Sequence, residues 1–480
     1  MSLCINNKER VDKNIYSSPL IETYIFFTRR KFMSIKYGVK KWYKPEKLSI
    51  KIILTIAILL FIRMCANIPI PLINQEYLKI LFENKTGFEL INAFSGGAFT
   101  NMTFMALSVT PYITASIILQ LLTIIFPNLA EIQKGGEEDK KKWELWQIIT
   151  SVILGIIQSV GLAITFGRQG LINNYGFWSI LLVSFLWTLG SIITIVAGTY
   201  ISKFCIGNGI SLILAINIMS TLPSDVLSFY TVYIKGQKLN HIIGIIPIAL
   251  IIIIGLIVFT VILNSAQKEI SVIYPKQAIH GNRKNVSTIP IKLNLAGVMP
   301  VIFASTLYSL PLMFLSNSQN KVAQAIVHFC SSTYWFDLEH WWRTFGFVFY
   351  GLLVIFFAYF YTAIVFNPRE VAQNLKKSGA CIPGIRPGQP TVEYIEKQCK
   401  YMTLLGAIYL FILTQVPTII THFSSIKSLS FGGTSVIIIV GVILETALVI
   451  KSEKVMLSYS IKKTNSFMGM NKNNIRRSVL

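Results

Sequence analysis

The sequence predicts an all-α membrane protein with ten transmembrane helices arranged in two halves. Three observations support this fold class. Of the 480 residues, 53% are hydrophobic and only 14% are charged, whereas a soluble domain carries about 25% charged residues. Apolar segments of bilayer-spanning length recur along the chain, and successive loops alternate between many and few basic residues.

Ten segments are candidates for membrane spans, since an α-helix needs about 20 mainly apolar residues to cross a bilayer. Two of them, near residues 208–222 and 403–421, are shorter or more broken than the others. The remaining eight cover residues 48–68, 102–126, 146–167, 177–200, 242–263, 295–316, 345–366 and 434–450. In the second of these eight, we expect the long helix to start around Phe104.

The distribution of basic residues predicts the orientation. The two tails and the even-numbered loops contain 34 Lys and Arg residues, and the odd-numbered loops contain 8. By the positive-inside rule, the N-terminal extension (1–47) and the C-terminal tail (451–480) are both cytoplasmic. The extension lacks the apolar core and cleavage site of a signal peptide. The net charge of +23 is therefore mainly topological, and part of it can still face a ribosome or another acidic partner.

A weak internal repeat predicts the two halves, residues 48–222 and 223–450. The fifth span opens with GNGIS and the tenth with FGGTS, and each motif is followed by an apolar run. Five spans in each half would make the halves inverted repeats, as in many transporters and channels. Chance placement of glycine is the alternative for matches this short.

Side chains that could carry chemistry are scarce in the predicted spans. Arg63 lies near one end of the first span, where it can snorkel to water, and Glu445 lies near the cytoplasmic end of the last. The five histidines lie at span ends or in loops, and the six cysteines form no CxxC pair. The sequence therefore predicts no catalytic residue, no metal site and no cofactor. A passive conduit is favoured over an enzyme, and a secondary transporter of small solutes is the alternative.

Two loops outside the cytoplasm have unusual composition. The stretch ELINAFSGGAFTN is too polar to span, so it forms either an external loop or a short segment folded back into the helix bundle, and the residues alone favour the loop. The loop SSTYWFDLEHWWRTFG contains Trp335, Trp341 and Trp342. Because tryptophan is enriched at bilayer interfaces, we expect these three side chains to form an interfacial anchor.

Seven stretches together resemble one family. In chain order they are IPIP, FSGGA, TPYITASIILQLL, GNGIS, PIKLNLAGVMPVIFAS, FYTAIVFNPREVAQNLKKSGACIPGIRPG and FGGTS. From about residue 48 to 455, the chain resembles the SecY family, which forms the channel subunit of the Sec protein translocon. The resemblance implies two pseudo-symmetric, inverted five-helix halves. It also implies a lateral gate to lipid, between spans two and three and spans seven and eight.

The resemblance assigns a pore ring and a plug. The plug would be the segment at about 87–103, which favours the folded-back reading of FSGGA, and its central residues would be Phe94, Ser95, Gly96, Gly97 and Ala98. The ring would be formed by the apolar side chains of Val109, Ile113, Leu214, Ile218, Ile302 and Ile438. The first two pairs have i,i+4 spacing, which places each pair on one helix face. Taken without the family, the same residues read as ordinary core or lipid-facing positions.

Two cytoplasmic loops, at about 264–294 and 367–402, would receive a motor or a ribosome. The resemblance assigns docking to Lys268, Lys376, Lys377, Gly384, Arg386 and Pro387. Proline fixes φ and glycine permits tight turns, so IPGIRPG is stiffer than an ordinary solvated loop. A guanidinium group held there can bind a phosphate or a carboxylate with two parallel hydrogen bonds.

The resemblance also implies partners and a location. The partners would be a SecE-like and possibly a SecG-like subunit, the SecA motor, a ribosome with its nascent chain, a YidC-like insertase, signal peptides and membrane lipids. The location would be a bacterial inner membrane, with a plastid thylakoid membrane as the alternative. In this reading the chain passes unfolded secretory polypeptides across the membrane and releases transmembrane segments sideways into lipid.

Overall fold

The computed structural model describes most of the chain after residue 47. The described residues are 48–74, 78, 89–173, 175–234, 239–274, 287–315, 320–330, 335, 344–423 and 433–477. Residues 48–480 form one compact unit. The predicted N-terminal extension belongs to a separate unit and lies outside the described residues.

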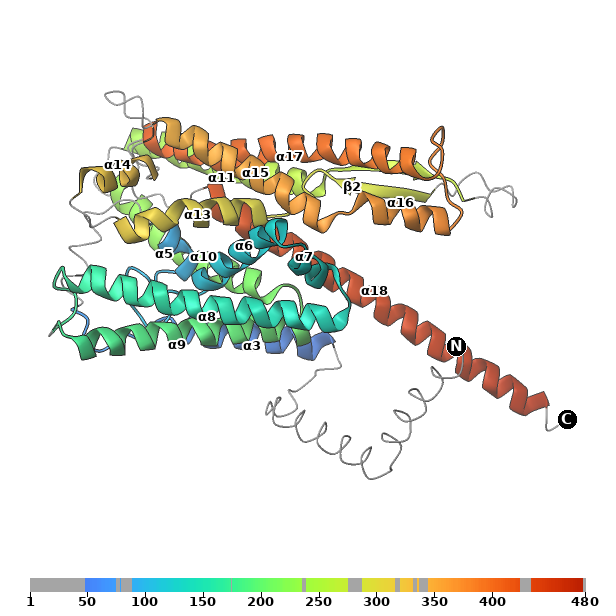
Figure 1. Ribbon diagram of the computed structural model, residues 1–480, viewed down its shortest axis with the longest axis horizontal. Helices are drawn as coiled ribbons and strands as arrows, with labels where there is room; N and C mark the ends of the chain where they lie inside the picture. The colour runs from blue at the N-terminus through green and yellow to red at the C-terminus, as the bar shows by residue number, and fades with distance from the viewer. Residues whose placement is uncertain are drawn as a thin grey trace, which may run out of the picture. The chain divides into compact units, whose positions relative to one another are not determined.

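Helices dominate the compact unit (Figure 1). The first group of helices is α3 (Leu48–Cys65), α5 (Glu89–Ser95), α6 (Thr110–Ile125), α7 (Pro127–Lys134), α8 (Glu137–Gly167), α9 (Phe177–Phe204) and α10 (Gly209–Tyr233). The second group is α11 (Leu239–Ser265), α13 (Met299–Leu315), α14 (Lys321–Cys330), α15 (Thr344–Val365), α16 (Pro368–Lys377), α17 (Gln389–Phe423) and α18 (Gly433–Arg477). Between α11 and α13, the antiparallel strands β1 (Gln267–Val272) and β2 (Ser287–Lys292) pair from Gln267 with Lys292 to Val272 with Ser287.

Each predicted span coincides with one helix of the structure: α3, α6, α8, α9, α10, α11, α13, α15, α17 or α18. Among the described residues, seven helices are long and apolar enough to cross a bilayer, or eight if α6 and α7, bent by 117°, count as one span. The described apolar parts of α11 and α13 are shorter, Leu250–Ser265 and Met299–Pro311. The chain is therefore an all-α, multi-pass membrane protein, and the full count of ten spans stays a prediction.

The predicted span over 102–126 is wrong at its N-terminal boundary. Helix α6 starts at Thr110 and not around Phe104. The backbone has positive φ at Met102 (42°) and Ser108 (44°), in a region that a right-handed helix cannot include. Hydropathy did not reveal this break because the apolar residues that precede α6 are buried in an irregular segment.

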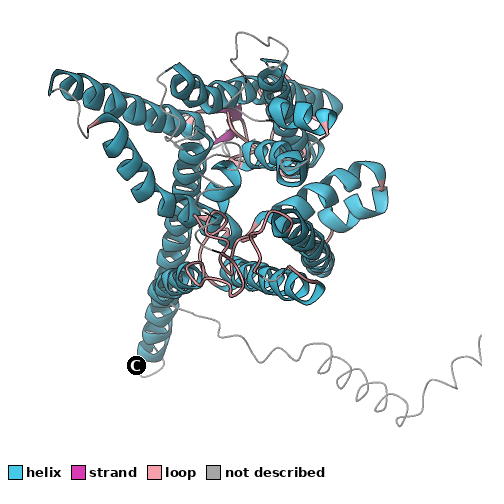
Figure 2. Cartoon of the chain, turned by 90° about the vertical axis from the view of Figure 1, so that its left-hand side faces the viewer, coloured by secondary structure: helices cyan, strands magenta, loops and turns pink. Residues whose placement is uncertain are grey.

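The two groups of helices contact each other through several helix pairs. Among them, α10 packs against α18, and α13 packs against α6 and α8. The short helix α5 packs against α10 and α13, so it lies between the groups. Figure 2 shows the strands among the helices of one group and irregular loops among those of the other. The contact of α13 with α6 and α8 is the one that the predicted lateral gate would have to open.

The tryptophan expected at the bilayer interface is buried instead. Trp335 is only 3% exposed, and its ring centroid lies 5.7 Å from that of Tyr308. Its Nε1–H donates a hydrogen bond to the Tyr308 hydroxyl at 3.1 Å, so the indole is satisfied inside the protein. The expectation was wrong for Trp335 because the partner aromatic side chains come from α13 and α15, which are distant in the sequence. Trp341 and Trp342 lie outside the described residues.

Several helices continue beyond the bilayer. Helix α17 has 35 residues, which makes it about 52 Å long at 1.5 Å per residue, against about 30 Å for a hydrocarbon core. Helix α15 is followed by α16 after a break of two residues. Helix α18 runs through most of the predicted C-terminal tail, to Arg477. The helices α16 and α17 therefore form a solid projection beyond the spans, on the side that the sequence predicts to be cytoplasmic.

Candidate functional site

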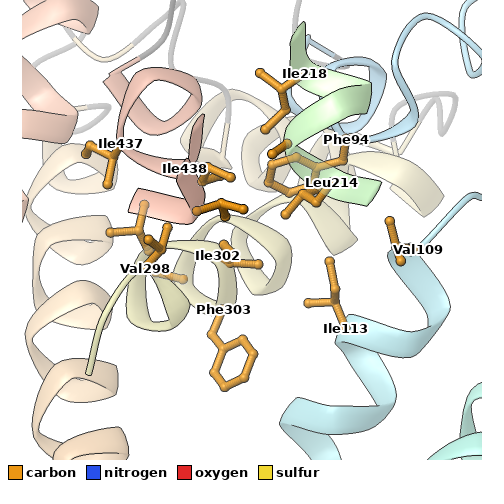
Figure 3. Close-up of a cluster of buried hydrophobic side chains, with 14 of the residues drawn as sticks. Phe94, Val109, Ile113, Leu214, Ile218, Val298, Ile302, Phe303, Ile437 and Ile438 are labelled. Carbon is orange, nitrogen blue, oxygen red and sulfur yellow. The ribbon is translucent and has the colours of Figure 1, made fainter. Parts of the chain in front are cut away.

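The six residues assigned to the pore ring lie together in the structure. Val109 is the N-cap residue of α6 and Ile113 lies in its first turn, Leu214 and Ile218 are on α10, Ile302 is on α13 and Ile438 is on α18. All six belong to one buried hydrophobic cluster, and none is more than 4% exposed. Figure 3 shows these side chains converging from four separate helices. Their role as a pore ring stays a prediction, although their convergence is a feature of the fold.

Local sequence explains how the helices deliver these side chains. The side-chain oxygen of Asn208 caps α10 by accepting the N–H of Ser211 at 3.4 Å, and Gly207 before it has a φ of 74°. Helix α10 therefore starts after a break of only four residues from the end of α9, and Leu214 is reached within two turns. In α6, proline at the start of the helix costs no hydrogen bond.

The segment assigned to the plug packs against the same cluster. Helix α5 ends at Ser95 and is followed by glycines in the left-handed region, Gly96 with φ 68° and Gly97 with φ 84°. The N–H of Gly97 bonds to the Asn92 carbonyl at 3.0 Å and that of Gly96 to the Ala93 carbonyl at 3.1 Å, which is a Schellman motif. The side chains of Phe94, Ser95 and Ala98 are at most 2% exposed.

Backbone carbonyls of this segment accept hydrogen bonds from α3 and α10. The Asn217 amide donates to the Phe94 carbonyl and to the Ser108 hydroxyl, both at 2.9 Å. The Gly96 carbonyl accepts from the Ser220 hydroxyl at 3.2 Å and from both Nη atoms of Arg63 at 3.3 Å. We call these three donors, Arg63, Asn217 and Ser220, the plug latch.

Sequence reasoning missed the plug latch. Arg63 was expected to snorkel to water, and this expectation was wrong, because its guanidinium group is half-buried and binds the Gly96 carbonyl. An arginine near a span end gives no sign of which way it points. The signal that could have found it is the pair of glycines, since a turn with positive φ leaves carbonyl groups without helical partners.

A cavity of about 300 Å³ with a mixed polar and apolar lining reaches the ring at Ile302. Its polar lining comes from Asn208 at the start of α10, Asn264 and Asn294 around the β-strands, and Lys292 and Glu445. The Asn294 amide donates to the Asn264 side-chain oxygen at 3.0 Å. Side-chain amides can donate to and accept from peptide groups, and they are neither nucleophiles nor metal-activating groups at neutral pH. The amides of this cavity can therefore hydrogen-bond to polar chain.

The two loops assigned to docking form one module with a small core of its own, which we name the cytoplasmic module after its predicted side. Residues of β1, β2, α16, α17 and the turn after α16 make this core: Ile270, Val272, Ile291, Ala372, Leu375, Ala380, Ile382, Val392, Ile395 and Cys399. Ile273 and Cys381 exchange backbone hydrogen bonds at 2.9 and 3.0 Å, which joins the loops. The predicted docking residue Lys268 is held by the Gln398 side chain at 2.7 Å.

The turn after α16 presents Arg386 to solvent. Helix α16 has Glu370 in its first turn and Lys376 and Lys377 in its last, an arrangement that suits the helix dipole. Gly384 and Gly388 have φ of 78° and 115°, values that disfavour other residues. The Thr391 hydroxyl donates to the Arg386 carbonyl at 2.9 Å. The backbone of Arg386 and Pro387 is thus fixed while both side chains are exposed.

Comparison with known proteins agrees with this geometry. The family model described as SecY matches residues 103–447. The protein translocase subunit SecY of Streptomyces coelicolor is 35% identical over 434 residues, covering 86% of this chain and 96% of the relative. The subunit of the same name from Escherichia coli is 34% identical over 455 residues, covering 90% and 97%.

Solved structures share the fold. One is a SecY channel whose plug domain is described as stabilising the closed state and maintaining a membrane seal, and another is Sec61 in the canine ribosome-channel complex. Each has a TM-score of 0.57 and 19% sequence identity, and the match covers 88% of this chain and 97% of the other. On the family model and the bacterial relatives, this chain belongs to the SecY family.

Proposed function

We propose that this chain is the central subunit of a protein-conducting channel. It passes unfolded secretory polypeptides across the membrane and releases transmembrane segments sideways into lipid. The observation that carries the proposal is the convergence of six buried aliphatic side chains from four helices. Branched aliphatic side chains can narrow a pore, exclude water by dewetting and still yield to a passing peptide.

The predicted plug at about 87–103, of which the structure describes residues 89–103, is proposed as the plug of the closed channel. It supports the ring because Phe94 packs in the same cluster, beside Leu214 (Figure 3). The plug latch bonds to main-chain carbonyls, so each bond can break and reform without a covalent step. Opening the channel then means releasing this segment and separating α13 from α6 and α8.

The cytoplasmic module is proposed as the docking surface for SecA or a ribosome. A passive channel does no chemical work of its own, so a partner has to supply the driving force. Lys376, Lys377 and Arg386 are exposed cations on a fixed backbone, and they fit carboxylate or phosphate groups of such a partner. SecE-like and SecG-like subunits and a YidC-like insertase complete the proposed assembly, and signal peptides would enter through the gate.

The bacterial relatives support a bacterial inner membrane as the location, with a thylakoid membrane as the alternative. The cytoplasmic module lies between the eighth predicted span, in α15, and the ninth, in α17. Eight spans would precede it and two would follow it, so both ends of the helical unit would lie on the same side of the membrane as the module, in the cytoplasm. Cysteine residues introduced into the turn after α16 should react with an impermeant reagent only from the cytoplasmic side.

The test of the channel is a photo-crosslink between a probe at Ile302 and a stalled, signal-bearing nascent chain. We expect an adduct whose position on the nascent chain changes with chain length. A probe at Ile443 is the control, because this residue of α18 is 53% exposed on the outside of the helix bundle. No adduct at Ile302 in correctly inserted protein would overturn the proposal and direct attention to a small-solute transporter and uptake assays.

A further inference from the structure

Helix α14 lies at the end of the second group of helices that is farthest from β2 and α16 (Figure 1). It follows α13, precedes α15 and packs against both. Because the cytoplasmic module lies at the other end of α15, α14 lies on the opposite side of the membrane, which we call the trans side. Its ten residues, KVAQAIVHFC, mix apolar and polar side chains, so each face of the helix has its own chemistry.

Two of the three faces of α14 are accounted for by protein and water. Successive residues turn by about 100° around a helix, so residues seven apart share a face. Ala323 and Cys330 are seven apart and both are buried, which identifies the face that packs on the protein. The polar side chains of Lys321, Gln324 and His328 share a second face. That face suits water or lipid headgroups.

The third face is apolar and exposed. Val322 and Ile326 lie one turn apart and are 66% and 39% exposed, and the exposed Ala325 lies beside them. The half-buried Phe329 completes the face, which covers about 100° of the helix circumference. We call these four residues the apolar face of α14. A helix with separate apolar and polar faces is the kind that lies in the plane of a membrane surface.

The C-terminal end of α14 is fixed at a defined depth. The Tyr308 hydroxyl of α13 donates a hydrogen bond to the Phe329 carbonyl at 2.5 Å, and Nε1–H of Trp335 donates to the same carbonyl at 3.2 Å. Tyr308 lies seven residues before Leu315, the last residue of α13, which is about 10 Å along the helix axis. The end of α14 therefore lies about 10 Å inside the trans end of α13, which agrees with the depth of about 5–10 Å at which interfacial helices bind.

The apolar face of α14 continues the lipid-facing surface of α15. Helix α15 lies in a segment that is long and apolar enough to cross a bilayer, and Val348 and Leu352 are exposed on it. Phe349 of the same helix is also exposed, and its ring centroid lies 5.7 Å from that of Phe329. Through this ring contact, the surface that α15 exposes to lipid passes directly into the apolar face of α14.

We propose that α14 is an interfacial helix whose apolar face binds the trans leaflet of the bilayer, at the boundary of acyl chains and headgroups. The contact is apolar, so it does not depend on the charge of the headgroup. Tyr308 belongs to α13, the helix that contacts α6 and α8 at the predicted gate. Helix α14 therefore holds the trans end of α13 at a fixed depth. This inference does not depend on whether the ring conducts polypeptides.

The experiment introduces a photo-reactive benzophenone amino acid at Val322 or Ile326 of the full chain. The purified variants are irradiated in vesicles of phosphatidylethanolamine and phosphatidylglycerol, and in vesicles of phosphatidylcholine, and phospholipid adducts are measured by mass spectrometry. We expect adducts at both positions, with equal yield in the two kinds of vesicle. A probe at Gln324 is the matched control on the polar face and should give no phospholipid adduct. A probe at Val348, exposed on α15, is the positive control.

An adduct at Val348 without one at Val322 and Ile326 would overturn the proposal, because the apolar face would then lie in water. Equal yields at Val322 and Gln324 would also overturn it, since lipid would then not distinguish the two faces. The same probes are irradiated in cell membranes. A protein adduct at Val322 in place of the phospholipid adduct would assign the face to a partner chain or to a second copy, and not to lipid. Near-native melting of every variant establishes that the probe has not unfolded the chain.

Discussion

Asn217 is buried, and its amide donates one hydrogen bond to the segment 89–103, at the Phe94 carbonyl, and one to the Ser108 hydroxyl that follows the segment. In N217D an acceptor replaces the donor, so the Phe94 carbonyl loses its partner, while the Ser108 hydroxyl can turn to donate to the new carboxylate. An unsatisfied buried polar group costs about 1–3 kcal/mol. We expect the closed state to weaken by this amount and the resting channel to conduct ions, which planar-bilayer recordings would measure.

The control for this prediction is N320D. Asn320 is exposed and its side-chain oxygen accepts the N–H of Val322 at 3.3 Å, a role that aspartate keeps. N320D should therefore conduct no more than the wild-type chain. A resting conductance of N217D as low as that of N320D would contradict the role given to the plug latch.

Gly96 and Gly97 form a matched pair that separates backbone strain from contact. Both have positive φ, so alanine at either position carries a similar backbone cost of about 1–2 kcal/mol. A Cβ on Gly96 would lie 2.5 Å from Nη1 of Arg63, 2.7 Å from Oγ of Ser220 and 2.9 Å from the Asn217 carbonyl, and a Cβ on Gly97 would meet nothing within 4 Å.

We therefore expect G96A to raise the resting conductance well above that of G97A, because only G96A pushes apart the plug latch. Thermal melting of the two variants in detergent measures the shared backbone cost. Equal conductance in the two variants would mean that the latch is not tight at Gly96.

Single residues were predictable from the sequence where a pattern constrains them. The ring residues could be assigned through the resemblance, and they do lie in one cluster. The direction of Arg63 and the burial of Trp335 could not be predicted, because each depends on partners more than 20 residues away, Gly96 for Arg63 and Tyr308 for Trp335. A polar side chain can form its hydrogen bonds either with water or with protein. Which of the two it does is decided by tertiary contacts alone.

At the scale of elements, the helices were predictable because hydropathy reports burial in lipid or protein. The ends of the helices were less predictable than their existence, as the late start of α6 at Thr110 illustrates. The paired strands β1 and β2 depend on contact with α16 and α17 through the small core of the cytoplasmic module. Strands of this kind are hard to predict from the sequence of their own loop, because the residues of the core that they join come from three separated stretches of the chain.

The cytoplasmic module provides the prediction at this scale. In R386E the exposed side chain reverses its charge, while the turn keeps its glycines and the Thr391 bond to the backbone of residue 386. The loss of one charge-assisted hydrogen bond to a partner corresponds to about tenfold or more in affinity. We expect partner-driven export to fall by about that factor, as measured in inverted membrane vesicles.

Melting should change little in R386E, because substitutions of exposed side chains usually alter stability by less than about 0.5 kcal/mol. K454E is the matched control, since Lys454 is exposed on α18 outside the module. Export by R386E at the rate of K454E would exclude Arg386 from the docking surface.

At the scale of the whole molecule, the ring depends on four helices from both groups. In I438N an amide enters a cluster in which Ile438 is fully buried. Water then enters the closed pore more easily, and the seal against ions weakens. We expect I438N to export substrates with defective signal sequences, and I443N, a polar change on the exposed side of the same helix, to reject them. Rejection by both variants would count against the ring.

The first and last helices of the described chain are joined by an ion pair between Lys51 and Glu453, at 2.7 Å, with side chains 24% and 30% exposed. This pair links α3 of the first group to α18 of the second, 402 residues apart. Partial burial and wide separation in sequence make it a candidate for coupling the two groups. A pair of this exposure is worth up to about 1 kcal/mol.

A double-mutant cycle measures that coupling. K51E and E453K should each lower the melting temperature, because each places like charges side by side, and the double swap should recover most of the loss. The cycle of K142E and D139K on α8 is the control, since this exposed pair at 3.0 Å lies within one helix and should couple by no more than about 0.5 kcal/mol. If the effects of K51E and E453K simply add, the ion pair does not couple α3 to α18, and the contacts of α10 with α18 and of α13 with α6 and α8 are left to hold the groups together.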